Sequence, residues 1–551
     1  MFRKLVFLLV IAATPDFTDA ECLTKRRPEY HNFPSGFKWS VATSAFQIEG
    51  ASKEDGRGPT IWDEYQEKPG KIIDNSTADI SSDSYHKFRE DIKLLKSLGV
   101  SHYRFSLSWS RMFPTGVTMN PNLKGIQHYH AVIDTLIENN IEPMVTLYHW
   151  DLPLALHDAG GWLNKEIVKW FRLYAVFCFR EYGNKVKLWV TLNEPFAQAT
   201  FGYCGIKGED APGGFQEHCH WAQYLVGHHM LLAHAHAYRA YHGLPSKLKG
   251  KIGIVNGMVW VEPESEPESE FAQEVLQWTV DWFIHPLFEG DYPAKMREII
   301  DKNSKAEGRS GSRLPYFTPY EQDWLIGSFD FLGVNYYITH FVRRFRQGEK
   351  RVRFSVREAI GYDIDGISYL STRDMSVGGK DSWLRSHPAG LRALLNYIRH
   401  HYDNPEVFIT ENGCMDTPGE SLNDVTRMRY LREHIAAVSQ AIVDGCNVVG
   451  YTLWTLIDNF EWTAGYTKLF GIHKVDFTSP SRTRTPKRSA LLYADIIRNN
   501  SVVLVEGALL MEQLERISKE RTSSTHLEPF QIDNNDRNKY SFMENRQGRL
   551  K

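Results

Sequence analysis

Two glutamates far apart in the chain are the side chains best suited to catalysis. Glu194 lies in the string Thr191-Leu-Asn-Glu-Pro195, and Glu411 lies in Ile409-Thr-Glu-Asn-Gly413. Each glutamate follows a β-branched, apolar run and precedes a turn residue. Two carboxyl groups usually cleave a glycosidic bond, one by donating a proton to the leaving oxygen and one by attacking or stabilising the sugar carbon. The pair is therefore a candidate for glycoside hydrolysis, provided that the fold brings the two side chains together.

Strand-like apolar runs alternate with helix-like segments over residues 36–500, and no Ser/Gly linker or charge block divides that span. Alternation of strands with crossover helices is typical of a parallel sheet, and eight strands favour the α/β class with a closed (β/α)8 TIM barrel. No GxGxxG or phosphate-loop fingerprint favours an open sheet. The sequence predicts strands at residues 37–43, 101–106, 142–147, 187–192, 250–255, 329–335, 407–410 and 448–453, and helices at residues 83–98, 127–139, 165–182, 218–241, 388–400 and 424–444.

A barrel would bring the two glutamates together although they are far apart in sequence, because side chains at the carboxyl ends of its strands converge on one face. Glu194 follows the fourth predicted strand and Glu411 the seventh, so both are expected to reach one site. Asn193 and Glu194 are adjacent, and adjacent residues on a regular strand face opposite sides. They can share the site only if the backbone twists or bulges there, with Pro195 ending the strand.

Composition narrows the choice of ligand. Lys and Arg number 64 against 67 Asp and Glu, a formal net charge of -3 among 551 residues. This balance provides no long-range field that would attract nucleic acid or an anionic membrane. The six cysteines show no CxxC spacing, so no metal site is predicted. An uncharged or weakly charged small ligand fits best.

Over roughly residues 33–500 the chain resembles the family 1 glycoside hydrolases, which include β-glucosidases, lactase and myrosinases. The resemblance is carried by several strings in family order. Besides the two glutamate motifs, they are Phe33-Pro-Ser-Gly-Phe-Lys-Trp39, Ala42-Thr-Ser-Ala-Phe-Gln-Ile-Glu-Gly50, Tyr103-Arg-Phe-Ser-Leu-Ser-Trp109, Tyr148-His-Trp-Asp-Leu-Pro153, Asn335-Tyr-Tyr337 and Asn459-Phe-Glu-Trp462.

The resemblance implies a retaining β-glycosidase that acts on β-linked glucose or a related hexose in small β-glycosides or oligosaccharides, without a cofactor. It makes Glu194 the general acid/base and Glu411 the nucleophile, with carboxyls about 5 to 5.5 Å apart. Glu194 must then hold a proton while Glu411 stays ionised. Residues that match catalytic support positions are Arg104, Asn335 and Tyr337, and those that match sugar-binding positions are Gln47, His149, Asn193, Trp454, Glu461 and Trp462.

Two other functions stay open at this stage. A non-catalytic binding protein of the Klotho type would use a glycosidase-like domain as a receptor surface, although such relatives typically lack one of the paired glutamates. A myrosinase-like thioglucosidase is the second alternative, although plant myrosinases have glutamine at the position of Glu194. The loops at residues 201–219 and 343–369 are expected to decide substrate choice beyond the first sugar. The oligomeric state cannot be inferred from the sequence.

The amino terminus indicates secretion. Residues 1–20 combine Arg3 and Lys4 with a short apolar run and small residues near Ala20, as expected for a cleaved signal peptide; an uncleaved anchor is the less favoured alternative. No later apolar run is long enough for a transmembrane segment. The protein is therefore expected outside the cell or in the lumen of the secretory pathway. Asn75 and Asn499 begin glycosylation triplets. Cys204 and Cys219 form either a disulfide or two free thiols. Residues 515–551 are expected to be a charged, disordered tail.

Overall fold

The computed structural model describes residues 29–504, except residues 206–209, 249, 350–362, 372 and 380–381. Within this part of the chain, Tyr30–Val503 form one compact unit. The predicted signal peptide at residues 1–20 and the predicted tail at residues 515–551 lie outside the described residues.

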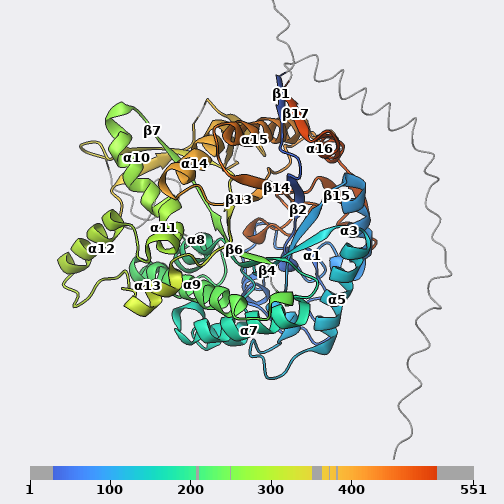
Figure 1. Cartoon of the computed structure of the whole chain (residues 1–551), viewed down its shortest axis with the longest axis horizontal. Helices are drawn as coiled ribbons and strands as arrows, with labels where there is room; N and C mark the ends of the chain where they lie inside the picture. Colours follow the sequence, from blue (N-terminus) through green and yellow to red (C-terminus); the bar gives the residue numbers. More distant parts are fainter. Residues whose placement is uncertain are drawn as a thin grey trace, which may run out of the picture. The chain divides into compact units, whose positions relative to one another are not determined.

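Eight parallel strands form a closed barrel, and the helices surround these strands (Figure 1). All eight predicted strands are confirmed, with both ends of each within two residues of the expected position. In order around the ring they are β2 (Lys38–Ala42), β3 (His102–Ser106), β4 (Glu142–Tyr148), β5 (Leu188–Asn193), β6 (Lys251–Gly257), β8 (Phe331–Asn335), β13 (Val407–Asn412) and β14 (Val448–Trp454). Pairing of β14 with β2 closes the ring.

The six predicted helices are also present. They are α3 (Ser84–Leu98), α5 (Leu123–Glu138), α7 (Glu166–Tyr182), α9 (Cys219–His242), α14 (Pro388–His401) and α15 (Val425–Val443), and α16 (Arg488–Asn499) follows the last barrel strand. Gly99 ends α3 in the left-handed conformation, φ +77°, as a glycine C-cap should. Helix α5 begins four residues before its predicted start, and Gly125 in its first turn lies so close to the backbone of Arg111 that a side chain would not fit there.

Shorter elements complete the described part of the chain. The helices are α1 (Ala45–Ile48), α2 (Ile61–Gln66), α4 (Trp109–Met112), α6 (Leu154–Asp158), α8 (Pro195–Ala197), α10 (Ser269–Leu276), α11 (Trp282–Glu289), α12 (Ala294–Ala306) and α13 (Pro319–Leu325). The strands are β1 (Glu29–Asn32), β7 (Trp260–Pro263), β9 (Thr339–Arg344), β10 (Gly366–Tyr369), β11 (Met375–Val377), β12 (Leu384–Ser386), β15 (His473–Val475), β16 (Arg484–Pro486) and β17 (Ser501–Leu504).

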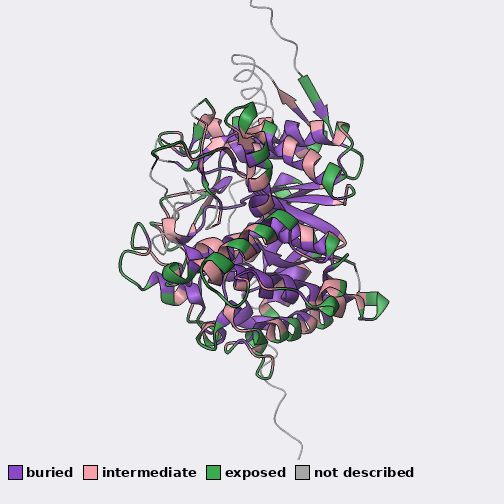
Figure 2. Cartoon of the chain, turned by 90° about the vertical axis from the view of Figure 1, so that its left-hand side faces the viewer, coloured by how far each residue is buried: buried purple, intermediate pink, exposed green. Residues whose placement is uncertain are grey.

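Side chains from neighbouring barrel strands fill a common core. Met144, Val190, Val255, Phe331 and Phe408 come from five different strands and pack into one buried cluster. The barrel strands are buried along most of their length, whereas exposed residues concentrate on the outer helices and loops (Figure 2). A filled interior leaves the ends of the strands as the places where functional side chains can gather.

One charged region contains a strand. The basic residues between 343 and 353 predict a solvated loop, but Arg343 and Arg344 belong to β9, the central strand of the small sheet β10-β9-β7. Arginines in and just after β9 pair with carboxylates beside β7 and on α10: Arg346 Nη2 lies 2.7 Å from Glu264 Oε2, and Arg344 Nη2 lies 2.9 Å from Glu274 Oε2. The basic and acidic side chains neutralise each other, and this allows a strand here. A count of charges along one stretch of sequence does not show such pairing.

Candidate functional site

Glu194 owes its direction to an abrupt turn at the end of β5. The register of β5 on β6 shifts just before Asn193, and Glu194 adopts a left-handed conformation with φ +46° and ψ 64°. Pro195 then begins α8. The turn brings both neighbouring side chains to one partner, because Asn335 Nδ2 donates to Asn193 Oδ1 at 3.2 Å and to Glu194 Oε1 at 2.7 Å. The twist that the sequence requires is therefore present.

Glu411 lies on β13 with both carboxylate oxygens engaged. Arg104 Nη1 donates to Oε1 at 2.6 Å, and the Tyr337 hydroxyl donates to Oε2 at 2.8 Å. Arg104 is 1% exposed and Glu411 is 4% exposed. A buried carboxylate held by a guanidinium and a phenol hydroxyl is stabilised as the anion, the state that nucleophilic attack needs.

The two glutamates are joined through shared neighbours. Arg104 Nη2 donates to Asn193 Oδ1 at 2.6 Å, so its guanidinium contacts both Glu411 and Asn193. Asn335, which contacts Glu194 and Asn193, is the Cα partner of Glu411 in the pairing of β13 with β8. The structure thus links two carboxyls that are far apart in sequence, at the carboxyl ends of β5 and β13, through Asn335 at the end of β8, which lies between those strands in the barrel.

The surroundings favour different protonation states for the two carboxyl groups. Burial and, next, the negative charge of Glu411 raise the pKa of Glu194 to about 8. Burial also raises the pKa of Glu411, but the Arg104 charge and the hydrogen bonds from Arg104 and Tyr337 oppose that increase. Glu194 faces the neutral amide of Asn335, whereas Glu411 faces a cation. A proton shared between the two therefore resides on Glu194 at neutral pH.

A second group of polar side chains adjoins the carboxyls. Gln47 is fully buried, and its Nε2 donates to Glu461 Oε2 at 3.1 Å, while its Oε1 accepts from the Ser44 hydroxyl at 2.7 Å. Burial, followed by the charge of Glu411, raises the pKa of Glu461 to about 8. These groups offer donors and acceptors at fixed positions, as hydroxyl recognition requires.

Aromatic rings complete the cluster. The His149 ring stacks on Trp454 at a centroid distance of 5.7 Å and on Trp462 at 5.9 Å. Asn193 Nδ2 donates to His149 Nε2 at 3.1 Å. Burial, and then the nearby Arg104 charge, keep the pKa of His149 well below its usual range, so the ring is neutral with its proton on Nδ1. The indoles supply apolar surface beside these polar groups, the combination that a pyranose ring needs.

Comparison with known proteins decides the family. Residues 29–502 match the sequence profile of glycosyl hydrolase family 1. The chain belongs to that family. It is 42% identical to beta-glucosidase 42 of Arabidopsis thaliana over 85% of this chain and 94% of the relative. It is 40% identical to human lactase/phlorizin hydrolase over 86% of this chain, but it spans only 24% of that longer protein.

Solved structures give the same answer. The family 1 chain superimposes on an aphid myrosinase with a TM-score of 0.79 and 38% identity, covering 85% of this chain and 99% of the other. A family 1 β-glucosidase from Thermotoga maritima gives a TM-score of 0.75 with 34% identity, covering 86% and 99% of the two chains. The protein is therefore a glycoside hydrolase of the β-glucosidase type on a (β/α)8 barrel, which sets aside the non-catalytic alternative.

Sequence reasoning missed three contributors to the site of this family 1 enzyme. Thr410 donates its hydroxyl to Asn335 Oδ1 at 2.7 Å, and Thr146 accepts from Arg104 Nε at 3.2 Å. A Cβ on Gly257 would lie 2.7 Å from the carboxyl carbon of Glu194, so the absence of a side chain there makes room for that carboxyl. All three lie at or near the carboxyl ends of barrel strands, a position that could have signalled their role.

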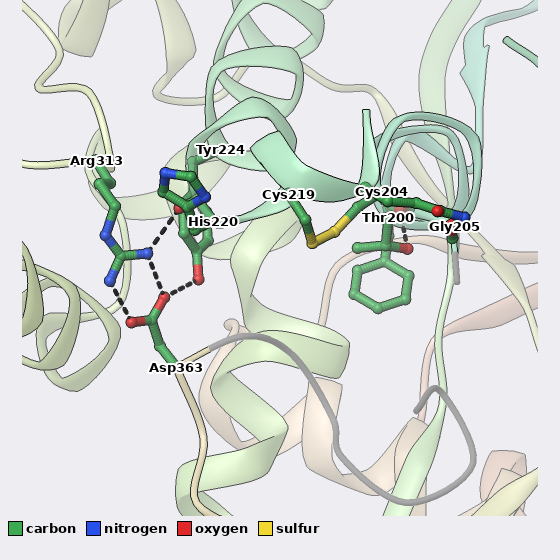
Figure 3. Close-up of a disulfide and its surroundings, with 10 residues drawn as sticks. Thr200, Cys204, Gly205, Cys219, His220, Tyr224, Arg313 and Asp363 are labelled. Carbon is green, nitrogen blue, oxygen red and sulfur yellow. Dashed lines mark hydrogen bonds and ion pairs between the residues drawn. A yellow bond between two sulfur atoms is a disulfide. The ribbon is translucent and has the colours of Figure 1, made fainter. Parts of the chain in front are cut away.

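A disulfide closes the segment that follows Glu194. Cys204 forms a disulfide with Cys219, the first residue of α9, so the two are not free thiols (Figure 3). Cys178 and Cys446 are buried free thiols. Further along α9, the Tyr224 hydroxyl donates at 2.6 Å to Asp363, whose carboxylate forms a buried ion pair with Arg313 (Figure 3). The amino-terminal end of α9 therefore binds one residue of each segment expected to govern substrate choice: Cys204 of residues 201–219 and Asp363 of residues 343–369.

Glycosylation at Asn75 and Asn499 stays a prediction. Asn75 and Asn499 are both exposed, which glycosylation requires but does not establish. Among the described residues, no helix has the length and apolar character needed to cross a membrane, and no group of three or more His, Cys, Asp or Glu side chains is arranged to hold a metal ion.

Proposed function

We propose that this family 1 enzyme is a secreted, retaining β-glycosidase that releases β-linked glucose or a related hexose from an aglycone or a short oligosaccharide. The observation that carries the proposal is the unequal environment of the two carboxyls. Glu411 receives a guanidinium and a phenol hydroxyl, whereas Glu194 receives an amide and has its pKa raised to about 8. One group is thereby prepared as an anion and the other as an acid.

The first chemical step uses both states. The Glu411 carboxylate attacks the anomeric carbon while Glu194 gives its proton to the leaving oxygen, so that the glycosidic bond breaks and a glycosyl ester on Glu411 forms. In the second step the Glu194 carboxylate takes a proton from water, and the water oxygen attacks the anomeric carbon. Glu411 leaves as the carboxylate and Glu194 is protonated again. Two inversions give a product with the original β configuration.

The neighbouring side chains bind the sugar in this proposal. Asn193, held by Arg104 and Asn335, faces the 2-hydroxyl, where hydrogen bonds strengthen in the transition state. Gln47 and Glu461 contact hydroxyls farther around the ring, together with His149. Trp454 and Trp462 offer apolar surface to the C–H face.

Product stereochemistry tests the proposal directly. Proton NMR during hydrolysis of p-nitrophenyl β-glucoside should show β-glucose first and the α anomer only after mutarotation. Glu411→Gln should reduce kcat by at least about 10³-fold, because the nucleophile is lost. Appearance of α-glucose as the first product would contradict the assignment of roles. A panel of β-galactoside and β-fucoside substrates identifies the preferred hexose.

Secretion is proposed from the amino-terminal sequence. Expression in a eukaryotic secretory host should yield protein in the medium that begins close to residue 21, as read by amino-terminal sequencing. Removal of N-glycans should lower its mass if Asn75 or Asn499 is modified. Retention of residues 1–20 on a membrane-bound product would support the uncleaved anchor instead.

A thioglucosidase is the second candidate, favoured by the similarity to the aphid myrosinase. A sulfur leaving group needs no protonation but tolerates an acid, so Glu194 is compatible with this reaction. The two candidates predict different dependence on Glu194. With an O-glucoside that has a poor leaving group, Glu194→Gln should abolish most release of the aglycone. With a glucosinolate, the same variant should still release the aglycone in a first-turnover burst, because only the second step then needs Glu194 as the base.

A further inference from the structure

A buried ionic cluster joins the loop after β13 to the loop after β14. Lys487, which immediately precedes α16, is 1% exposed, and its Nζ donates to Asp416 Oδ1 at 2.7 Å, to Asp416 Oδ2 at 2.8 Å and to Asp458 Oδ1 at 2.9 Å. These contacts use the donors of one ammonium group on two carboxylates. Asp416 lies five residues after Glu411, and Asp458 lies three residues before Glu461.

Arg427 of α15 fastens the same loop on the Glu411 side. Its Nε donates to the Cys414 carbonyl at 3.1 Å, and its guanidinium pairs with Asp416 and Asp424. Arg427 is 2% exposed. The backbone directly after the nucleophile is therefore held from the helix layer outside the barrel, and Lys487 extends that hold to the next loop.

The other end of the cluster reaches the sugar-binding side chains. Asp458 is fully buried, and its Oδ1 also accepts from the Gly471 N–H at 3.0 Å. The next residue, Asn459, accepts at Oδ1 from Gln47 Nε2 at 3.1 Å, and the Phe460 N–H donates to the Gln47 carbonyl at 3.1 Å. Gln47 in turn donates to Glu461. Because these groups are bonded to one another, displacement of Asp458 would move them together relative to Glu411.

The two loops also touch directly at the strand ends. A Cβ on Gly413 would lie 1.9 Å from the Trp454 carbonyl oxygen, so the backbone after Glu411 is in close contact with the end of β14. Contact alone does not fix the spacing of two loops, whereas a buried ammonium between two carboxylates does, because removal of Lys487 would take away the ion pair of the buried Asp458.

We propose that Lys487 is a positioning residue for the glycosidase reaction: by bridging Asp416 and Asp458, it fixes the nucleophile Glu411 relative to the side chains that bind the sugar. The inference rests on the proposed function. It concerns a residue outside the catalytic and sugar-binding groups, and it predicts a loss in the chemical step with little change in ground-state binding, since each loop keeps its own contacts.

The test replaces the bridge and a matched pair elsewhere. Lys487→Met with Asp458→Asn removes the link while retaining side-chain volume and the carbonyl oxygen at position 458. The control is Arg484→Met with Asp91→Asn, which removes another buried ion pair, 3% and 5% exposed, that joins β16 to α3. Active sites are counted by labelling with a 2-deoxy-2-fluoro-β-glucosyl fluoride, and kcat is expressed per labelled site.

The bridge variant should lose about 10- to 100-fold in kcat per labelled site with KM changed less than about threefold, as expected for a misplaced reacting group. The control should keep its kcat per site even if its melting temperature falls. Unchanged kcat per site in the bridge variant would overturn the inference. If that variant does not fold, Asp416→Asn, whose side chain is 24% exposed, should show the same loss in smaller measure, and wild-type kcat there would overturn it equally.

The two proposals fail in different ways. A wild-type protein that releases no nitrophenol and takes no label contradicts the proposed function. A wild-type protein that hydrolyses and takes label normally, beside a bridge variant of equal kcat, contradicts only the role of Lys487.

Discussion

At the scale of single residues, the placement of one proton decides the chemistry. Glu194 and Glu411 are the same residue type, and their difference comes from the partners on each side. The sequence could supply Arg104, Asn335 and Tyr337 as candidates for this work through the family resemblance, but it could not supply the distances. The 2.6 Å contact of Arg104 with Glu411 and the 2.7 Å contact of Asn335 with Glu194 turn that resemblance into a physical argument.

The pH profile should reflect this placement. The acid must be protonated in the free enzyme, so kcat/KM should fall as pH rises through about 8, where Glu194 loses its proton. Initial rates with an unactivated alkyl β-glucoside between pH 5 and 10 measure this decrease. Glu194→Gln should abolish the alkaline decrease along with most activity. A profile that falls near pH 5 instead would contradict the proton assignment.

The same group makes stability depend on pH. The pKa of Glu194 is raised from its ordinary value of 4.5 to about 8 in the folded protein. Between these pH values the folded state retains a proton that the unfolded state releases. The free energy of unfolding therefore falls as pH increases from about 4.5 to 8. Glu194→Gln removes this contribution and should raise the melting temperature more at pH 8 than at pH 5. Calorimetry at both pH values checks the difference, and an equal shift at both would contradict it.

At the scale of elements, the positions of the strands were predictable and the irregularities at their ends were not. Apolar runs predict barrel strands because both faces of such strands are buried. The left-handed turn at Glu194 could be argued only as a requirement, from the adjacency of Asn193 and Glu194. The space left by Gly257 and the strand character of Arg343 depend on neighbours from other parts of the chain, which no local pattern contains.

A substitution at Gly257 tests whether the end of β6 must leave space for the Glu194 carboxyl group. Gly257→Ala places a methyl group 2.7 Å from the Glu194 carboxyl carbon and should displace the acid, reducing kcat by about 10- to 100-fold. The matched control is Gly311→Ala, because a Cβ at Gly311 meets nothing within 4 Å. Steady-state kinetics of both variants, with circular dichroism to confirm folding, gives the comparison. Equal kcat in the two variants would show that Glu194 does not need this space.

At the scale of the whole molecule, the barrel needs both ends of the described chain. Asn500 receives a hydrogen bond at Oδ1 from Trp39 Nε1 at 3.0 Å and donates from Nδ2 to the Phe33 carbonyl at 2.8 Å. Phe33, Phe37 and Trp39 pack ring against ring. The first barrel strand is thus held by residues that come after the last helix, which fits the family match over residues 29–502.

Truncation tests that organisation. A protein comprising residues 29–504 should fold and keep wild-type kcat and KM. A protein ending at residue 498 loses Asn500 and the second strand of the β1–β17 pair, and it should lose several degrees or more of melting temperature. Thermal unfolding of the two proteins measures the difference. Loss of activity in the 29–504 protein would show that the remaining residues contribute to the site.

The identity of the nucleophile is the central claim, and covalent trapping tests it most directly. A 2-deoxy-2-fluoro-β-glucosyl fluoride slows the release of the glycosyl enzyme, so proteolysis and mass spectrometry can locate the attached sugar. The account predicts one label per molecule, on Glu411. A label on Glu194 or Glu461, or normal turnover of p-nitrophenyl β-glucoside with no covalent label formed, would contradict it.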